Sequence, residues 1–328
     1  MGFSFGHVIG AGSFARRRSL LRRTVKPLGV APAKPGAYHF LVSPGIEVLL
    51  LTRRSFLRAS GAAIAAAAGL GLYTWRVEPH WLEFVYRALP IRGLPASLLG
   101  RTLVQLSDIH VGGRVDDDYV TAAFRRVAAL RPDIVVVTGD LMSYHSKVFE
   151  QMASVYRHFP TGRLATLAVL GNHDYGPEWS HPEIAARIVD TVAEFGITVL
   201  RNQVHEIESL RVVGLDDLWA KRFDTRQVVP LVKSAPPAVV LSHNPDTVDL
   251  PVWDGYEGWI LSGHTHGGQC KPPFLRPPLL PCRNRLYTAG EFDIGAGRRL
   301  YISRGIGHLL HVRFNVRPEV TIFELRAA

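Results

Sequence analysis

Apolar runs that end in polar, glycine-containing turns recur along residues 100–328. The first run, Leu103 to Leu106, leads into a turn that carries Asp108 and His110. The second, DIVVVTGDL, is a continuous β-branched run, which is typical of a strand buried on both faces. Three more runs have the same form and lie in RLATLAVLGNHDYG, PPAVVLSHNPD and GWILSGHTHGGQ. We therefore expect five strands that each end in a polar turn.

A helical pattern separates the first two runs. Residues Asp116 to Asp118 suit the first turn of a helix, and DYVTAAFRRVAAL then places apolar residues at helical spacing until Pro132. This alternation of strands and helices predicts an α/β fold. In such folds the loops at the carboxyl ends of the strands converge on one crevice. The five polar turns are therefore expected to share one site.

Composition and charge indicate a globular protein and bear on whether it binds nucleic acid. The chain has 328 residues, of which 47% are hydrophobic, so it can bury a full core as one large domain or two smaller ones. The net charge of +10 would suit a nucleic-acid-binding protein. However, residues 1–76 hold eleven Lys or Arg and one acidic residue, whereas residues 77–328 hold 27 of each sign. A neutral main domain argues against nucleic acid as the main partner.

The charged N-terminal part contains a pattern that resembles a twin-arginine export signal. Arg53 and Arg54 are followed by Phe56, Leu57 and Arg58, and then by an Ala-rich uncharged segment up to Tyr73. An amphipathic or buried helix is the alternative, but the segment has no polar face at helical spacing. The predicted partner is the twin-arginine export machinery, and the predicted location is the periplasm or the outer face of the cytoplasmic membrane.

Two features leave the fate of this segment open. The apolar stretch is shorter than the roughly 20 residues of a membrane span. No small-x-small cleavage site follows it in YTWRVEPHW, so retention as an N-terminal membrane anchor remains an alternative. We expect residues 1–51 to be a poorly ordered basic extension or to lie outside the true start. Residues 52–76 are then the signal or anchor, 77–99 a linker, and 100–328 the main domain.

The polar turns contain a set of side chains that suits metal ions. They carry three carboxylates, one Asn and five histidines: Asp108, His110, Asp140, Asn172, His173, Asp174, His243, His264 and His266. One such turn could simply link two strands. Five of them are hard to explain by packing, because these groups are costly to bury without strong partners. Oxygen and imidazole donors without thiolate suit Mn, Fe or Zn.

The order of the motifs resembles the calcineurin-like metallophosphoesterases. Their signature is Asp-x-His, Gly-Asp, Gly-Asn-His-Asp/Glu, a single His and Gly-His-x-His, and residues 100–328 contain all five blocks in this order. The segments VQLSDIH, VVGLDD, LSHNPD, GHTHGGQ and VRFNVRPEV are similar to the exported or membrane-associated bacterial branch of the YkuE and YaeI type. An acidic residue that often follows the Gly-Asp block is absent from GDLMSY, which weakens any inference about the substrate.

The resemblance implies a fold, a metal centre and a reaction. The fold would be two packed mixed β-sheets flanked by helices, in four α-β-β-α layers. One metal would be held by Asp108, His110, Asp140 and His266, and a second by Asp140, Asn172, His243 and His264, with Asp140 bridging them. His173 would stabilise the phosphoryl charge or protonate the leaving oxygen, and Asp174 would orient it through a hydrogen bond. A purely structural His–Asp pair is the alternative.

The expected function is hydrolysis of a phosphoester by a monomer with two divalent metal ions. The favoured substrate is a phosphodiester or pyrophosphate carried by a lipid or a cell-envelope precursor, and contact with a membrane surface fits this. The alternatives are a general phosphomonoesterase and a non-catalytic envelope-binding protein with a structural metal site. The presence of His173 and Asp174 argues against the last, because a structural site needs no imidazole outside the ligand set.

Other polar residues have open roles. Asp216 and Asp217 follow an apolar run and either approach the site or cap a turn. Cys270 and Cys282 flank a Pro-rich segment and form either a disulfide or two free thiols. Six other histidines lack ligand-like spacing and are expected to be core or surface residues: His145, His158, His181, His205, His308 and His311.

Overall fold

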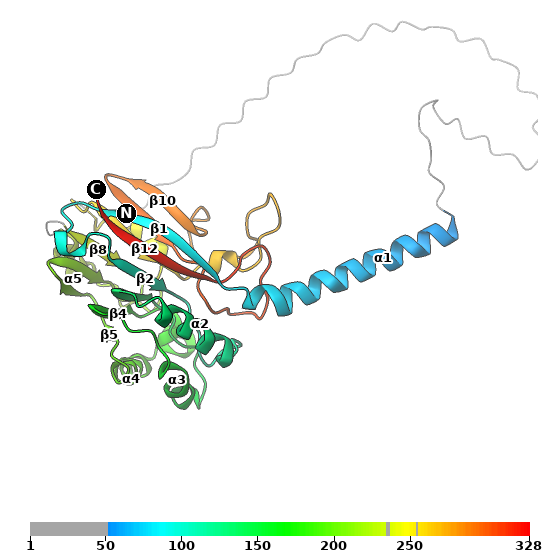
Figure 1. The fold of residues 1–328 in the computed structure, drawn as a ribbon, viewed down its shortest axis with the longest axis horizontal. Helices are drawn as coiled ribbons and strands as arrows, with labels where there is room; N and C mark the ends of the chain where they lie inside the picture. Colours follow the sequence, from blue (N-terminus) through cyan, green and yellow to red (C-terminus); the bar gives the residue numbers. More distant parts are fainter. Residues whose placement is uncertain (1–51, 234–236, 254) are drawn as a thin grey trace, which may run out of the picture. The chain divides into compact units, whose positions relative to one another are not determined.

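The computed structural model describes residues 52–233, 237–253 and 255–328 (Figure 1). Residues Phe56–Ala328 form one compact unit. The prediction of a poorly ordered basic extension at residues 1–51 lies outside the described residues.

The described part contains five α-helices, twelve strands and several short helical turns. The helices are α1 (Arg53–Leu72), α2 (Asp117–Ala129), α3 (Val148–Tyr156), α4 (Pro182–Ala193) and α5 (Thr225–Val232). The first six strands are β1 (Glu83–Ile91), β2 (Thr102–Leu106), β3 (Ile134–Thr138), β4 (Ala165–Val169), β5 (Thr198–Val199) and β6 (Gln203–Ile207). The other six are β7 (Leu210–Gly214), β8 (Ala238–Leu241), β9 (Gly258–Ser262), β10 (Gly290–Gly295), β11 (Arg298–Ile302) and β12 (Glu319–Ala327).

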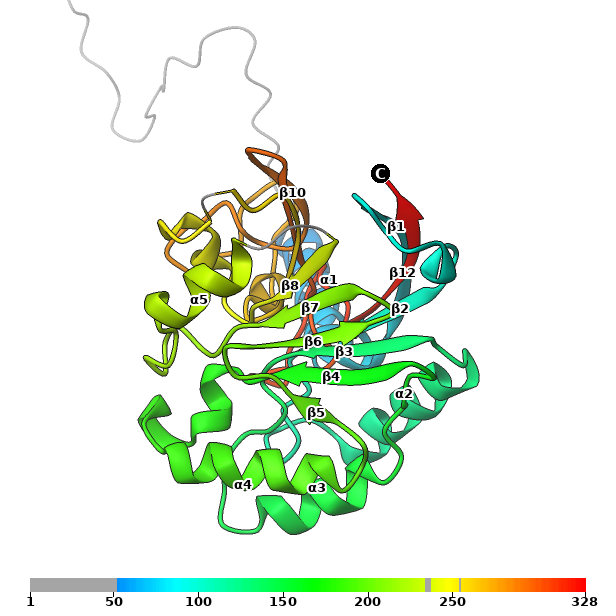
Figure 2. The same cartoon turned by 90° about the vertical axis from the view of Figure 1, so that its left-hand side faces the viewer.

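The strands form two six-stranded mixed sheets that face each other (Figure 2). The first has the order β1-β12-β2-β3-β4-β5, and the second has the order β10-β11-β9-β8-β7-β6. In the first sheet only the β12–β2 pair is antiparallel. In the second sheet β9, β8 and β7 are parallel, with antiparallel pairs at both edges. The predicted pair of mixed sheets is confirmed.

Three hydrophobic cores separate the layers. In β3, Ile134 and Val136 point into the core between the two sheets, while Val135 and Val137 point into the core under α2, α3 and α4. Successive side chains of a strand face opposite ways, which explains why this run is apolar throughout. A third core lies on the outer face of the second sheet, where Val228 and Val232 of α5 pack. The layers are therefore α-β-β-α.

The five strands expected from the sequence are present as β2, β3, β4, β8 and β9. The predicted helix is α2, and its N-cap is Asp116, whose carboxylate accepts hydrogen bonds from the N–H groups of Asp118 and Tyr119. These local predictions are confirmed. They matter for function because each strand ends at a candidate site residue.

The segment predicted as a linker, residues 77–99, is largely structured. It contains β1, which pairs in parallel with β12 along nine residues, from Glu83 opposite Glu319 to Ile91 opposite Ala327. Only Leu89 and Ile91 of this edge strand are buried, so its sequence lacks a regular alternation. The linker prediction was wrong for this reason, and the folded domain begins before residue 100.

The proposed export segment is helical. Residues Arg53–His80, which comprise α1 and the short helical turns after it, form a 28-residue stretch long and apolar enough to cross a membrane. This helical stretch is longer than the apolar segment expected from the sequence, which was too short for a membrane span. Length and composition are the whole basis of this match, and a signal sequence satisfies the same criterion. No residue of α1 is buried.

Candidate metal centre

All nine predicted site residues lie just beyond the carboxyl ends of five strands. β2, β3 and β4 are parallel neighbours in the first sheet, and β8 and β9 are parallel neighbours in the second. Their ends therefore deliver side chains from both sheets to one place. The seven proposed metal ligands are at most 3% exposed: Asp108, His110, Asp140, Asn172, His243, His264 and His266.

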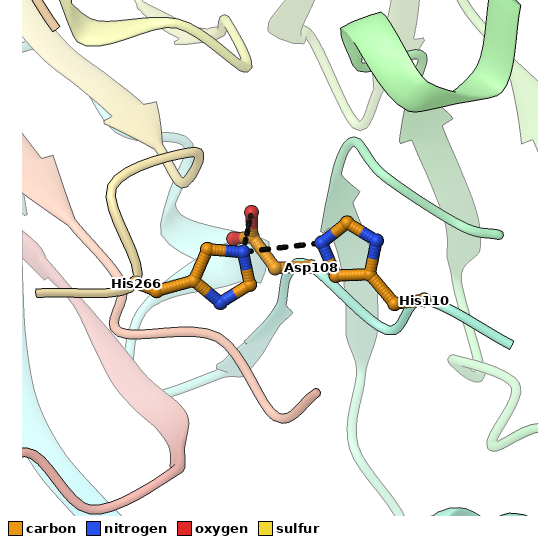
Figure 3. Close-up of side chains that lie close together, drawn as sticks. All are labelled: Asp108, His110 and His266. Atoms are coloured by element: carbon orange, nitrogen blue, oxygen red, sulfur yellow. Dashed lines mark hydrogen bonds and ion pairs between the residues drawn. The ribbon is translucent and has the colours of Figure 1, made fainter. Parts of the chain in front are cut away.

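One group of potential ligands consists of Asp108, His110 and His266 (Figure 3). The Nε2 atoms of His110 and His266 are 3.1 Å apart. The His266 Nε2 atom lies 3.4 Å from Asp108 Oδ1. Side chains from β2 and β9, which belong to different sheets, thus point at a common centre.

A second group consists of Asp140, His243 and His264. His243 Nε2 lies 3.2 Å from Asp140 Oδ2 and 3.1 Å from His264 Nδ1. The same Asp140 Oδ2 atom lies 3.5 Å from His110 Nε2 in the first group. One carboxylate oxygen is therefore within reach of both groups, which is the position that a bridging ligand requires.

Backbone strain is concentrated in these turns. Five of the candidate ligands have a positive φ although none is glycine, namely Asp108 (51°), His110 (54°), Asp140 (53°), His264 (70°) and His266 (49°). Such conformations are uncommon for residues with a side chain and gather at functional sites. The fold holds these side chains in place at a conformational cost.

Two motif glycines let the turns approach one another closely. A Cβ atom at Gly171 would overlap the carboxylate and backbone N of Asp140, and one at Gly263 would overlap Ser107 and Asp108. Any side chain at either position would push the ligands apart. The glycines of the Gly-Asn-His-Asp and Gly-His-x-His blocks are therefore required by the packing of the site.

Hydrogen bonds on the far side of two imidazole rings fix their orientation. His243 Nδ1 lies 2.7 Å from the carbonyl oxygen of Thr138, and His110 Nδ1 lies 3.0 Å from Ser143 Oγ. A carbonyl only accepts, so His243 carries its proton on Nδ1 and presents Nε2 to the site. This arrangement is common for histidines that bind metals.

Burial keeps three imidazoles in the neutral form that binds metals. It lowers the pKa of His110 to about 3 and holds the pKa values of His264 and His266 well below the usual range. A metal ligand must be unprotonated, so no proton has to leave these rings at neutral pH.

The carboxylates give the site a negative potential. Burial would lower the pKa of His243, but Asp140 and Asp108 raise it to about 10. Burial raises the pKa of Asp108 to about 7, whereas the positive potential of His243 and His173 outweighs burial and holds the pKa of Asp140 well below its usual range. The carboxylates of the site therefore stabilise a positive charge, such as that of a cation, next to Asp140.

Several buried polar atoms in the site have no hydrogen-bond partner among the described residues. They include Asn172 Oδ1, His264 Nε2 and His266 Nδ1. Leaving such groups unpaired is costly, whereas coordination of a cation would satisfy the amide oxygen. The donor set and the unpaired Asn172 Oδ1 atom fit two divalent cations. The unpaired nitrogens of His264 and His266 lie on the far side of rings that face the two ligand groups through Nδ1 and Nε2, respectively. The role of each ligand stays a prediction.

His173 and Asp174 lie differently from expectation. His173 is half-buried, and its ring is edge-on to His110 at 5.1 Å between centroids. The backbone N–H of His173 donates to Asp140 Oδ1 at 2.9 Å. Asp174 is fully buried and accepts from the N–H groups of Gly171, Leu141 and Met142. The expected hydrogen bond between the two side chains is not formed, because backbone donors take up both oxygens of Asp174.

Two tryptophans beside the site carry no motif and were missed in the sequence. The ring of Trp219 is edge-on to His264 at 4.3 Å, and the ring of Trp179 lies 5.0 Å from Trp219 and 6.4 Å from His173. Both are half-buried. They form an aromatic wall between His173 and His264. The sequences of the two loops that carry them contain no motif that would predict this position.

The open questions about Asp216 and Asp217 are resolved by their contacts. Asp217 Oδ1 accepts from the N–H of Ala220 at 2.7 Å, and so it closes a turn. Asp216 accepts from the Tyr175 hydroxyl and from Arg201 Nε. Both carboxylates are buried and stabilise the loop that holds Trp219. Asp217 therefore closes a turn, and it also lies close enough to the site for its charge to raise the pKa of His243.

The two cysteines are free thiols in this structure. Cys282 is buried, and its Sγ contacts the carbonyl oxygen of Asn284 at 3.1 Å. Of the histidines expected to lie outside the ligand set, none belongs to either group of potential ligands within the described residues.

Comparisons with known proteins agree with this geometry. The model of the calcineurin-like phosphoesterase family matches residues 101–268. The chain is 33% identical to "Phosphodiesterase YaeI" of Escherichia coli, over 84% of this chain and 100% of that protein. It is 29% identical to "Uncharacterized metallophosphoesterase YkuE" of Bacillus subtilis, over 84% of this chain and 98% of that protein.

A third relative has a more specific name. The chain is 26% identical to "UDP-2,3-diacylglucosamine pyrophosphatase LpxG" of Chlamydia muridarum, over 80% of this chain and 96% of that protein. Taken with two groups of potential metal ligands at the ends of five strands, these matches show that the chain belongs to the calcineurin-like phosphoesterase family and is a metal-dependent phosphoester hydrolase.

Proposed function

We propose that the protein uses two divalent metal ions to hydrolyse a phosphodiester or pyrophosphate carried by a lipid or a cell-envelope precursor. The observation that carries the two-metal part is the position of Asp140 Oδ2, 3.5 Å from His110 Nε2 and 3.2 Å from His243 Nε2. The names of the relatives YaeI, a phosphodiesterase, and LpxG, a pyrophosphatase, support the choice of a diester or pyrophosphate. The diacylglucosamine in the name of LpxG supports a lipid-linked substrate.

The ligand sets follow the two groups of side chains. Asp108, His110, Asp140 and His266 would hold one cation, and Asp140, Asn172, His243 and His264 would hold the other. When bound, two such cations lower the pKa of water and neutralise charge on phosphoryl oxygens. The mixed oxygen and imidazole donors suit Mn, Fe or Zn. The protein needs no side-chain nucleophile for this chemistry.

His173 is the motif imidazole that neither group includes. Together with Trp179 it lines a pocket of about 380 Å³ at the edge of the site. A ring in this position can donate a proton to the leaving oxygen or stabilise charge on the phosphoryl group. Asp174 acts on it only indirectly, by fixing the backbone of Gly171 and of the loop after β3.

A first test of this function is hydrolysis of bis(p-nitrophenyl) phosphate by the full chain. We expect turnover that a chelator abolishes and Mn restores. The buried carboxylates and imidazoles serve as metal ligands in this proposal, so without metal ions the site has no nucleophile that could attack phosphorus. The same preparation is assayed with p-nitrophenyl phosphate. A clear preference for this monoester would favour a general phosphomonoesterase, and metal binding without turnover of either substrate would favour an envelope-binding protein.

We also propose export by the twin-arginine route, with the protein acting at the outer face of the cytoplasmic membrane as a monomer. Arg53 and Arg54 begin α1, and the helical stretch Arg53–His80 is long enough to remain as an anchor. Changing both arginines to lysine is expected to leave the protein in the cytoplasm at constant charge. The measurement is fractionation of cells that express each form.

A matched control changes Arg22 and Arg23, the other isolated Arg pair of the N-terminal part, to lysine. This form should be exported normally. Export of the Arg53→Lys, Arg54→Lys protein that stops only when the general secretion route is blocked would contradict the proposal.

A further inference from the structure

An apolar pocket of about 330 Å³ adjoins the metal centre. The segment from Thr265 to Cys270, which includes His266, contributes part of its lining, and two loops contribute the remainder, at residues 278–281 and at Leu309, Leu310 and Val312. This volume falls in the range of about 300 to 1,000 Å³ that is usual for small-molecule sites. Leu309 also lines the pocket beside His173, so the two pockets share this residue.

Hydrogen bonds hold both walls of this pocket in place. The Gln269 side-chain amide donates to the carbonyls of Leu310 at 2.8 Å and Val312 at 2.9 Å, and its oxygen accepts from the N–H of Leu309 at 3.0 Å. The Arg285 guanidinium donates, at 3.1 Å each, to the carbonyls of Leu280, Pro277 and Pro278. The pocket is therefore formed before any ligand binds.

The outer rim of the pocket is apolar and basic. Phe274 is fully exposed, and Leu279 is 70% exposed. The exposed Lys271 and Arg276 flank the tip, and residues 270–285 contain four basic residues and no acidic one. Exposed aromatic and aliphatic side chains among positive charges are typical of segments that enter the interface of an anionic bilayer.

The second wall is joined to the candidate membrane span. The N–H of Arg313 donates to the carbonyl of Thr74 at 3.0 Å, and the ring of Trp75 lies 6.3 Å from that of His311. Thr74 and Trp75 belong to the stretch Arg53–His80 that is apolar enough to cross a membrane. The loop that lines the pocket thus contacts the end of that stretch.

From these observations we infer that the pocket beside His266 is an acyl-chain subsite, and that the loop 271–282 enters the bilayer so that a chain of the lipid substrate passes from the membrane into the pocket. The inference rests on the proposed function and deepens it, because it names a phosphoester of an acylated lipid as the substrate. An acyl chain in this pocket would place the lipid's phosphate beside His266.

A test by chain length uses the full-length protein in nanodiscs that contain phosphatidylglycerol. The substrates are methyl, butyl and octyl p-nitrophenyl phosphates, and the readout is the ratio of kcat/KM for the octyl to the methyl compound. We expect a ratio of at least about 10, because each buried methylene favours binding. In the Leu279→Asp variant, the octyl-to-methyl ratio of kcat/KM should fall close to the value that partitioning of the octyl chain into the nanodisc alone would give.

Leu286→Asp is the matched control, because Leu286 is 57% exposed and does not line the pocket. Partitioning of the octyl compound into the nanodisc is the same for both variants, so a difference between them reports on the pocket. Equal ratios in wild type, Leu279→Asp and Leu286→Asp would overturn the inference while leaving the proposed hydrolysis intact.

A second readout does not depend on turnover. Phosphatidylglycerol with a diazirine at the end of one acyl chain is placed in the nanodisc, irradiated, and the labelled peptides are identified by mass spectrometry. We expect labels at residues 278–281 and 309–312 in addition to α1, and their loss in Leu279→Asp. If both loops are labelled but no substrate is hydrolysed, the proposed function is refuted and the acyl-chain subsite is not.

Labels confined to α1 would overturn the inference. The same holds if neither loop is labelled and the protein behaves as a dimer in sedimentation analysis, since the apolar rim would then be the contact with a second copy.

Discussion

Replacing Asp140 with alanine is expected to remove both metal ions and to lower turnover by roughly 10³-fold or more, since each metal supplies several kcal/mol to the transition state. The reason is that Asp140 Oδ2 lies within 3.5 Å of a histidine from each group of potential ligands. Every other proposed ligand belongs to one group, so its loss should release one ion. Metal content per folded chain and turnover of bis(p-nitrophenyl) phosphate are measured on the same samples.

Asp133→Ala is the matched control for this prediction. Asp133 is also buried and adjoins β3, but at the opposite end of the strand, where it accepts hydrogen bonds from Thr102 and Arg163. Its loss should lower stability without changing metal content. Asp140→Asn keeps the shape of the side chain in case the alanine form does not fold. Two metal ions bound at unchanged affinity in either Asp140 variant would contradict a bridging role.

Replacing His173 with alanine is expected to lower turnover by roughly 10²- to 10⁴-fold, the usual contribution of a general acid or base. Every proposed ligand stays in place, so metal content and thermal stability should change little. The loss should be larger for glycerophosphocholine, whose alkoxide leaving groups need a proton, than for bis(p-nitrophenyl) phosphate, whose aryl leaving groups depart unaided. Turnover of both substrates is measured in wild type and variant.

The control for this experiment is His205→Ala, because His205 is half-buried in β6 and belongs to neither ligand group. Equal losses on the two substrates would indicate that His173 stabilises phosphoryl charge and does not donate a proton. Unchanged turnover on both would show that the ring has no catalytic role and would favour a structural position beside His110.

The sequence was informative wherever an apolar strand passes directly into a polar turn. The run before Asp140 is apolar on both faces because β3 lies between two cores, and this pattern is visible without a structure. The convergence of the turns then follows from the parallel strands. The division of the ligands into two groups came from the family resemblance, and the side-chain distances agree with it.

Other features left no trace in the sequence for identifiable reasons. β1 is an edge strand that buries only Leu89 and Ile91, so it lacks the alternation that marks a strand. The partners of Asp174 are backbone N–H groups, which every residue but proline offers, so no pattern could reveal them. Trp179 and Trp219 meet only because two distant loops fold together.

The place of β12 in the first sheet has a consequence for how the domain matures. β12 lies between β1 and β2, and it pairs with partners about 220 and 240 residues earlier in the chain. Contacts this distant form late, because a long loop must close before they contribute. Until residue 327 has been synthesised, β1 has no neighbour and one edge of β2 stays open. We therefore expect Asp108, which follows β2, to reach its final position only after translation of this segment, and metal loading to follow synthesis of the domain.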